Sequence, residues 1–561
     1  MSESSARARG CLGTSLRIPR GLFAALWLLS LVGLLIRVLR QPTIAGTYDV
    51  KLDEFLYAGQ RLLQGELLYE GLVNGALPLV QWLYAPSAWI GGLTAHRLLI
   101  LAVNLVGGLV LMGALRNLSA AGLIALRPGS RVPLAAATTF VVGGQMFPGG
   151  LSGHPHQFAN TFLVLALGAA SLALAPPSDL PPSSEGKGQA NRNRLAVAAS
   201  GAALVLALEC FLRLSSPLLM VTLLALVLIR VPRPLEVLAP LVGGALAMAL
   251  LTVAPYAARP HGAALVWAGA VQLPLEVASG FPAEGDRLLP LLGKFLSTPV
   301  AGLPIWLMVL VPCLGLVDLA GREGREPGRH GERLLLLPAL AVIFVLEVLL
   351  SFQRGDFETR DMQLLVVPLV LILACGFAEM ERSHRRWIRA SGLVAMLLMT
   401  LIFWNNTFVT ALSHPPRRPR APVRALEADR TLARRYLASQ PAAARGFTAP
   451  QDVALQRQLK QRASTVGIGP EWSLNQQELA PSWATQRLGL PTDPAATCQQ
   501  LTAPANHHLV WMRTDPSGPN TEAFLRACLA REPGGWEEIS DRLGLRSGEY
   551  RVFHRLPAQA P

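Results

Sequence analysis

The sequence predicts a mainly α-helical, polytopic membrane protein that ends in a small external α/β domain, and three observations support this fold class. Of the 561 residues, 51% are hydrophobic and only 15% are charged, whereas a soluble chain of this length would carry more charge. Apolar runs recur along most of the chain, each near the roughly 20 residues that cross about 30 Å of hydrocarbon. From about Ser413 onward these runs stop, and a Pro- and Arg-rich stretch introduces a region of soluble character.

The apolar runs predict about eleven transmembrane helices. We expect them near residues 21–39, 98–115, 133–148, 158–175, 195–212, 215–230, 235–254, 300–319, 334–351, 362–379 and 390–410. No small-residue cleavage site follows the first run, so we expect this helix to be retained rather than removed as a signal peptide.

Basic residues predict the orientation of these helices. The N-terminal segment carries Arg7, Arg9, Arg17 and Arg20, and alternate loops repeat this excess of Arg and Lys. Since basic loops stay in the cytoplasm, the N-terminus is expected inside and, after eleven spans, the C-terminal domain outside a bacterial-type inner membrane. The net charge of +14 then follows from topology signals and an Arg-rich tail, and no nucleic-acid partner is expected.

The chain therefore divides into a transmembrane module, residues 1–412, and an external C-terminal domain, residues 413–561. Within the module, residues 41–97 form a long first external loop, and Pro176–Arg194 is rich enough in Pro, Ser and Gly to predict a flexible cytoplasmic linker. Hydrophobic periodicity in the C-terminal domain predicts helices over 423–440 and 521–532 and strands over 507–514 and 550–556.

Two cysteines of the C-terminal domain form a candidate disulfide. Cys498 and Cys528 are the only cysteines after residue 413, and an external domain permits their oxidation. The alternative is a pair of unrelated thiols, with Cys528 simply buried on the apolar face of its helix.

An acidic pair, Asp53-Glu54, follows the first predicted span. Ionised groups are rare in and beside transmembrane helices because their burial is costly, so a carboxylate here is suited to abstract a proton at the bilayer surface. The alternative is that Asp53 only caps a helix, a position that carboxylates favour.

The residues around this pair predict two helices that lie on the membrane surface. Apolar residues between Phe55 and Leu63 share one helical face, with Gln60, Arg61 and Gln64 on the other. The second segment, Pro78–Gly92, contains the interfacial aromatic residues Trp82, Tyr84 and Trp89.

Taken in order, the motifs of this loop resemble the first external loop of the polyprenyl-phosphate-sugar glycosyltransferases. The motifs are Asp53-Glu54-x-x-Tyr57-Ala58, Leu62-Leu63-x-Gly65, Pro78-Leu79-x-x-Trp82-Leu83, Gly91-Gly92 and Ala95-His96-Arg97-Leu98. That family consists of integral membrane enzymes with the C-type glycosyltransferase fold and includes protein O-mannosyltransferases and lipid A aminoarabinose transferases. The resemblance implies inverting transfer of a sugar from a polyprenyl-phosphate donor to a glycan, lipid or protein acceptor outside the membrane.

The resemblance also implies roles for individual residues. Asp53 would be the catalytic base, and Glu54 would position the acceptor or the base. Further candidate contacts to the acceptor or donor are predicted on the same outer side, namely Asp49, Tyr57, His154, His156, Glu209 and Glu347.

A phosphate leaving group calls for a fixed cation, and arginine offers it a planar fork of donors. Arg213, Arg354 and Arg360 stand at the external ends of predicted spans. Arg360, supported by Arg213, is preferred because its segment resembles the Arg-Tyr-x-x-Pro segment of the family, although Asp361 replaces the aromatic residue. The alternatives are that Arg360 is an interfacial residue with no ligand, and that Glu209 neutralises Arg213 four residues further along one helix.

Two positions differ from the family pattern. Gly75-Ala76-Leu77-Pro78 contains no basic residue, and the loop Phe147–Gln157 contains no second carboxylate. No cofactor is expected. A divalent metal, which some family members require, stays an alternative that the sequence does not support: no cysteine has metal-ligand spacing, and His154 and His156 could hold a metal, but paired loop histidines without further ligands are more often solvated. A non-catalytic scaffold for envelope glycan assembly stays an alternative; a secondary transporter would need midplane charges and related halves, and neither is visible.

Overall fold

The structure is a computed structural model. It describes residues 20–40, 50–70, 72–73, 77–91, 93–146, 153–174, 186–210, 234–273, 311–315, 317–318, 363, 366–413, 421–441, 447–448, 452–459, 467–468, 482–490, 494–512, 521–532, 535–548 and 550–557.

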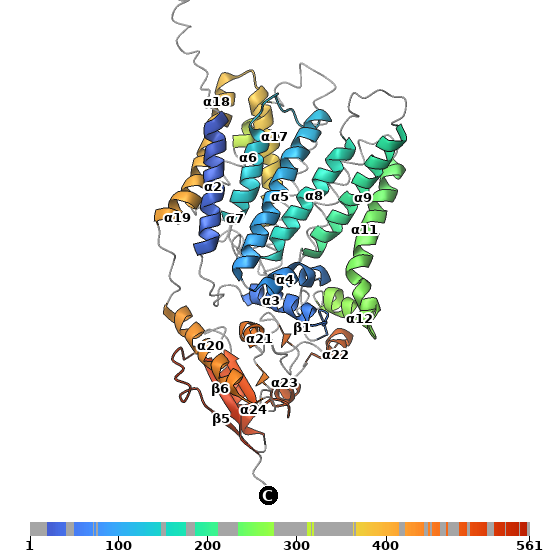
Figure 1. Cartoon of the computed structure of the whole chain (residues 1–561). Helices are drawn as coiled ribbons and strands as arrows, with labels where there is room; N and C mark the ends of the chain where they lie inside the picture. Colours follow the sequence, from blue (N-terminus) through green and yellow to red (C-terminus); the bar gives the residue numbers. More distant parts are fainter. Residues whose placement is uncertain are drawn as a thin grey trace, which may run out of the picture.

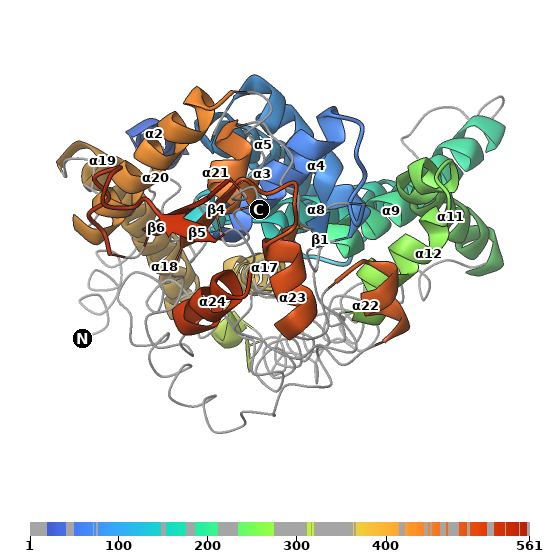
Figure 2. The ribbon, with the colours of Figure 1, turned by 90° about the horizontal axis from the view of Figure 1, so that it is seen from below.

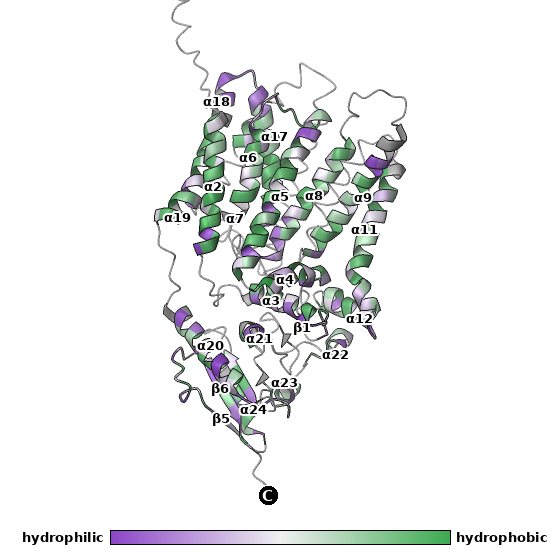
Figure 3. Ribbon diagram, viewed as in Figure 1, coloured by the Kyte–Doolittle hydropathy of each residue, from purple (hydrophilic) through white to green (hydrophobic). Residues whose placement is uncertain are grey.

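Long apolar helices run side by side and form a bundle (Figure 1). Its helices are α2 (Arg20–Arg40), α5 (Leu93–Ala120), α8 (Pro155–Leu174), α9 (Gly186–Cys210), α11 (Pro234–Ala257), α17 (Val366–Arg382) and α18 (Arg386–Trp404). Within the described residues, six helices have the length and apolar composition to cross a membrane: Gly21–Arg40, Leu93–Ala120, Pro155–Leu174, Asn191–Cys210, Val237–Ala257 and Arg386–Ser413. Hydrophobic residues dominate the bundle (Figure 3), so the predicted class, a multi-pass membrane protein, is confirmed.

Two of the predicted spans, 215–230 and 334–351, lie outside the described residues, so the total of eleven stays a prediction. The predicted flexible linker Pro176–Arg194 is wrong from residue 186 onward, because α9 already begins at Gly186. Gln, Ala and Arg are good helix formers, and they carry α9 beyond its apolar part.

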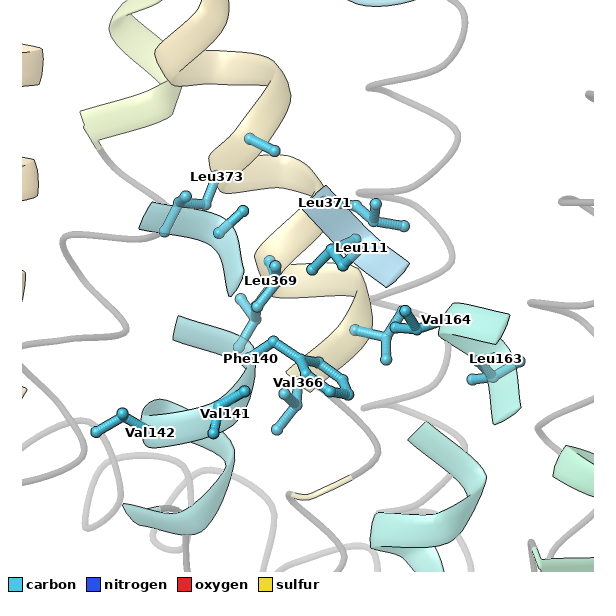
Figure 4. Close-up of a cluster of buried hydrophobic side chains, with 14 of the residues drawn as sticks. Leu111, Phe140, Val141, Val142, Leu163, Val164, Val366, Leu369, Leu371 and Leu373 are labelled. Atoms are coloured by element: carbon cyan, nitrogen blue, oxygen red, sulfur yellow. The ribbon is translucent and has the colours of Figure 1, made fainter. Parts of the chain in front are cut away.

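The centre of the bundle is formed where α5, α8 and α17 meet an interrupted helix made of α6 (Val132–Thr138), the π-helical segment η1 (Thr139–Gly143) and α7 (Gly144–Met146). Phe140 of η1, Val164 of α8 and Leu369 of α17 are fully buried in this core (Figure 4). Small residues allow the helices to approach closely: a Cβ on Gly108 of α5 would lie 2.7 Å from the Val141 side chain.

Two helices of the first loop, α3 (Val50–Leu63) and α4 (Pro78–Ile90), cross one end of the bundle (Figure 1). Pro78 starts α4, and Gly91 ends it with a positive φ of 100°, which are the positions that proline and glycine favour. As the sequence predicts, the two helices lie at the end of the bundle, and the C-terminal region lies on the same side (Figure 1).

The predicted exposure of these helices needs correction. α3 is buried from Leu52 to Gly59, because α4 and α21 pack on it. Of the predicted polar face, Arg61 is buried, Gln60 is half-buried and Gln64, just after the helix ends, is exposed. In α4, Trp82 and Trp89 are 44% and 77% exposed, whereas Tyr84 is fully buried instead of lying at the headgroup level.

The C-terminal region, residues 421–557, contains a four-stranded sheet with helices around it. The strands are ordered β2-β4-β6-β5, with β2 and β4 parallel and the other pairs antiparallel. They are β2 (Phe447–Thr448), β4 (His508–Met512), β5 (Trp536–Glu538) and β6 (Tyr550–Arg555). The helices are α20 (Ala421–Ser439), α21 (Val453–Leu459), α22 (Trp483–Arg487), α23 (Pro494–Leu501) and α24 (Thr521–Ala530). The predicted small α/β region is confirmed.

The C-terminal region is attached to the first loop. β1 (Leu72–Val73) of that loop pairs in parallel with β3 (Gly467–Ile468) of the C-terminal region, and α21 packs on α3 (Figure 2). A buried cluster adds Tyr57 of α3, Tyr256 at the end of α11 and Leu488 beside α22. The C-terminal region and the first loop therefore enclose the end of the bundle together.

Candidate active site

Asp53 lies at the centre of this enclosed end. Its side chain is only 4% exposed, and its Oδ1 atom accepts a hydrogen bond of 2.7 Å from Nη2 of Arg457 in α21. Because α3 already begins at Val50, Asp53 lies inside the first turn and is not the residue that caps the helix. Its neighbour Glu54 is equally buried.

The surroundings of Asp53 set its protonation. Burial raises the pKa of Asp53 from 3.8 to about 6, while the positive charges of Arg457 and Arg430 oppose this rise and the charge of Asp452 adds to it. A carboxylate with a pKa close to neutral can both hold and release a proton at working pH.

The helix that carries Arg457, α21, is fixed at its start by Asp452. Asp452 precedes α21, and its Oδ1 atom accepts a hydrogen bond of 2.9 Å from the backbone N–H of Leu455, which satisfies an otherwise unpaired donor of the first turn. The same carboxylate accepts hydrogen bonds from Nε of Arg430 at 2.9 Å and from the Tyr550 hydroxyl at 2.7 Å. The start of α21 is thus fixed to α20 and to strand β6.

The last part of the loop Phe147–Gln157, from Gly153 onward, is bound to α4 and α5 through the carbonyl oxygen of Gly153. This oxygen accepts hydrogen bonds from the Tyr84 hydroxyl at 2.5 Å and from Nε2 of His96 at 2.8 Å. Since a carbonyl can only accept, Nε2 carries the proton, and Nδ1 accepts from the Ser87 hydroxyl at 2.9 Å. Gly153 has a φ of +78°, and a Cβ there would lie 2.5 Å from the His96 ring.

The two histidines that follow Gly153 are enclosed, whereas the sequence predicts solvated side chains. His154 and His156 are each 1% exposed, and their ring centroids lie 4.3 Å apart. The His154 ring also meets the edge of Phe55, two residues after Asp53, at 5.7 Å. Gly153 and the two histidines are buried, and Tyr84 and His96 hold this segment against the first loop.

Among the described residues, no group of three or more His, Cys, Asp or Glu side chains is arranged around a common centre that could hold a metal ion. Asp49 and residues 147–152 lie outside the described residues, so the expectation about a metal stays a prediction.

Two further candidates occupy packing positions around the site. Tyr57 is buried in the cluster with Tyr256 and Leu488, and the guanidinium of Arg61 lies 5.9 Å from its ring. Glu209, in the last turn of α9, accepts a hydrogen bond of 2.7 Å from the Thr252 hydroxyl of α11 and so links these two helices. Asp49, Arg213, Glu347, Arg354 and Arg360 lie outside the described residues.

Sequence reasoning missed Arg457. It stands 404 residues after Asp53, in a short helix whose sequence, Val-Ala-Leu-Gln-Arg-Gln-Leu, contains no recognisable motif. Only the three-dimensional structure brings the two side chains together.

The bundle, the two helices across its end and the C-terminal region on the same side define a class of protein: the chain has the C-type glycosyltransferase fold, as the resemblance predicts. No family model matches the chain, and no curated protein matches it in sequence.

The likeness is to solved structures. ArnT from Cupriavidus metallidurans in the apo state is 14% identical, with a TM-score of 0.54 over 96% of this chain and 98% of ArnT. The same protein bound to undecaprenyl phosphate is 13% identical, with a TM-score of 0.54 over 96% of this chain and 99% of ArnT. The apo oligosaccharyltransferase from Archaeoglobus fulgidus is 11% identical, with a TM-score of 0.49 over 88% of this chain and 70% of that protein.

Proposed function

We propose that this protein is a membrane glycosyltransferase that moves a sugar from a polyprenyl-phosphate donor to a hydroxyl group of a glycan, lipid or protein, with inversion at the anomeric carbon. The observation that carries the proposal is Asp53, a buried carboxylate with a pKa of about 6 at the enclosed end of the bundle. The shared fold with ArnT, of which one structure holds undecaprenyl phosphate, supports a lipid-phosphate donor.

The proposed reaction needs one base and one leaving group. Asp53 takes the proton of the acceptor hydroxyl as that oxygen forms a bond to the anomeric carbon. The bond between the anomeric carbon and the phosphate oxygen breaks at the same time, and the lipid phosphate leaves with the electron pair. A positioned base is typically worth about 10²–10⁴-fold in rate. Glu54, adjacent on α3, would position the acceptor.

The departing phosphate needs a cation, and we propose Arg360, supported by Arg213, for this role. Both belong to predicted external ends of spans, and arginine stabilises phosphate charge through two parallel N–H donors.

The location of the reaction follows from the proposed topology. The N-terminus would be cytoplasmic, and the C-terminal domain, residues 413–561, would lie outside a bacterial-type inner membrane. The enclosed end of the bundle lies on the same side as the C-terminal region (Figure 1), so transfer would occur at the outer surface. The transmembrane module, residues 1–412, would bind the donor lipid from the bilayer.

The test is transfer by the purified protein in lipid. The protein is incubated with a panel of radiolabelled polyprenyl-phosphate sugars and with envelope glycan, lipid and protein fractions, and the label is followed into each fraction. We expect transfer by the parent protein and by Asp541→Asn, a remote carboxylate-to-amide control, but none by Asp53→Asn. Binding of the donors without any transfer would reject the proposal and favour a non-catalytic scaffold.

A further inference from the structure

The geometry points to Arg457 as a positioning residue that the C-terminal region contributes to the active site, where its guanidinium holds the carboxylate of Asp53 in place and in its charged form. This inference rests on the proposed function, because it assigns Arg457 a role toward the base of that reaction. It adds that the C-terminal region is a working part of the catalytic site.

The contact between the two residues is a charge-assisted hydrogen bond. Nη2 of Arg457 lies 2.7 Å from Oδ1 of Asp53, and the two side chains are 21% and 4% exposed. Such bonds are about twice as strong as those between neutral groups. The contact uses Oδ1, so a proton taken up on Oδ2 leaves the hydrogen bond from Arg457 in place.

Arg457 offsets the cost of burying a charged base. Burial favours the neutral form of a carboxylate, and an opposite charge within about 4–6 Å favours the charged form. The positive charges of Arg457 and Arg430 act on Asp53 in this direction, and the negative charge of Asp452 acts against them. Glu54 is the neighbouring acid on α3 itself, and the His154 ring approaches the same helix at Phe55.

The position of Arg457 is fixed by the contacts that Asp452 makes at the start of α21. Asp452, at the start of α21, binds the backbone of Leu455, the guanidinium of Arg430 and the hydroxyl of Tyr550. All three side chains, Asp452, Arg430 and Tyr550, are buried, and Arg430 also pairs with Glu427 one turn earlier on α20. The sheet and α20 therefore set the direction in which α21 presents Arg457 to α3.

A purely structural ion pair between the two parts of the molecule is the alternative. Loss of such a pair would lower the thermal stability and would also shift the titration of Asp53, because an opposite charge at hydrogen-bond distance stabilises the charged form. It would leave kcat of the folded protein unchanged at a pH where Asp53 is fully charged. Loss of a positioning residue would lower kcat of the folded protein even at that pH, so the two roles are separated by kcat at pH 8.5, measured together with the titration of Asp53.

The experiment uses the full-length protein in lipid. The infrared carboxyl band of Asp53, identified by its loss in Asp53→Asn, is titrated in the parent, in Arg457→Gln and in Arg457→Lys, together with the pH profile of transfer and the melting temperature. Gln458→Ala, a half-buried neighbour on the same helix, is the matched control. Tyr550→Phe tests the support of α21 without altering any charge.

We expect Arg457→Gln to move the titration of Asp53, and the acidic limb of the transfer profile, upward by about one pH unit. Arg457→Lys should return most of this shift, Tyr550→Phe should give a smaller shift in the same direction, and Gln458→Ala should give none. An unchanged titration in a folded Arg457→Gln protein, or a kcat at pH 8.5 equal to that of the parent, would overturn the inference. A shifted carboxyl band in a protein that transfers no sugar would instead reject the proposed function and leave only the electrostatic coupling.

Discussion

As the proposed base, Asp53 has to carry a negative charge in a buried position that favours its neutral form. A surface carboxylate with a pKa near 4 would be charged at every physiological pH but would be a weak proton acceptor. Burial raises the pKa of Asp53 to about 6, which makes the carboxylate a better base while most molecules remain charged at neutral pH. The ion pair with Arg457 limits this rise, so the site balances base strength against charge.

The pKa of Asp53 gives a pH-dependent prediction. Because the base must be deprotonated, kcat/KM for transfer should fall as the pH drops through about 6, with about a tenfold loss per pH unit below it. Rates measured from pH 4.5 to 8.5 over a range of acceptor concentrations, with a check that the protein stays folded, test this. A flat profile down to pH 5 would exclude Asp53 as the base.

Donor binding gives a second prediction at this scale. Arg360→Ala should weaken binding of a polyprenyl-phosphate sugar far more than Arg360→Lys, because phosphate recognition uses charge as well as the fork of guanidinium donors. Equilibrium binding of labelled donor by protein in nanodiscs measures the effect. If both variants bind like the parent, Arg360 is only an interfacial residue.

At the residue scale, sequence and structure contribute different halves of the site. The acidic pair is visible in the sequence because charge beside an apolar helix is rare. Arg457 is invisible there, because an arginine in a soluble, Arg-rich tail is ordinary and its importance depends on a fold that closes over a distance of 404 residues.

Among the elements, the segment that carries His154 and His156 is held in place through Gly153. Gly153 combines a positive φ with close contact to the His96 ring, and its carbonyl oxygen binds both Tyr84 and His96. A side chain at this position would strain the backbone and displace the ring.

Gly153→Ala should therefore lower the melting temperature and reduce transfer. Gly122→Ala is the matched control, because Gly122 has nearly the same φ of +77°, but a Cβ added there would meet no atom of the described residues within 4 Å. Backbone strain alone is worth roughly 1–3 kcal/mol, so both variants should lose this amount of stability and only Gly153→Ala should lose transfer. Equal effects of the two variants on transfer would contradict the role assigned to the contact between Gly153 and His96.

The elements differ in how far sequence patterns predict them. Long apolar helices are evident because crossing hydrocarbon requires about 20 consecutive apolar residues. The amphipathic pattern of α3 predicts the helix correctly, but it cannot show that other parts of the chain pack on this helix and bury Asp53 and Glu54. The two-residue strands β1 and β3 are too short for any periodicity.

At the scale of the whole molecule, the C-terminal region needs its own stabilisation. Cys498 of α23 and Cys528 of α24 are disulfide-bonded, with their Cα atoms 5.5 Å apart and a sequence separation of 30 residues. Closing a loop of this length is worth about 3–4 kcal/mol in the chain-entropy model. The bond also requires the oxidising environment that the proposed external location provides.

Thiol counting in denatured protein tests both statements. Of the six cysteines, we expect four to react with a maleimide when the protein is isolated without reductant and all six after reduction. Cys498→Ser with Cys528→Ser should lower the unfolding temperature of the C-terminal region. Six reactive thiols without reductant would contradict the disulfide and argue for a reducing location.

The pairing of β1 with β3 has a consequence for how the protein is made. A ribosome completes the first loop, with Asp53 and β1, long before it reaches Arg457, which lies 404 residues further along the chain, and β3. A nascent chain can insert its early helices but carries the proposed base without its arginine partner and a loop without its companion strand. Under the proposed function, transfer would begin only once Arg457 and β3 have been made and have joined the first loop, so that unfinished chains would leave the lipid-phosphate donor unused.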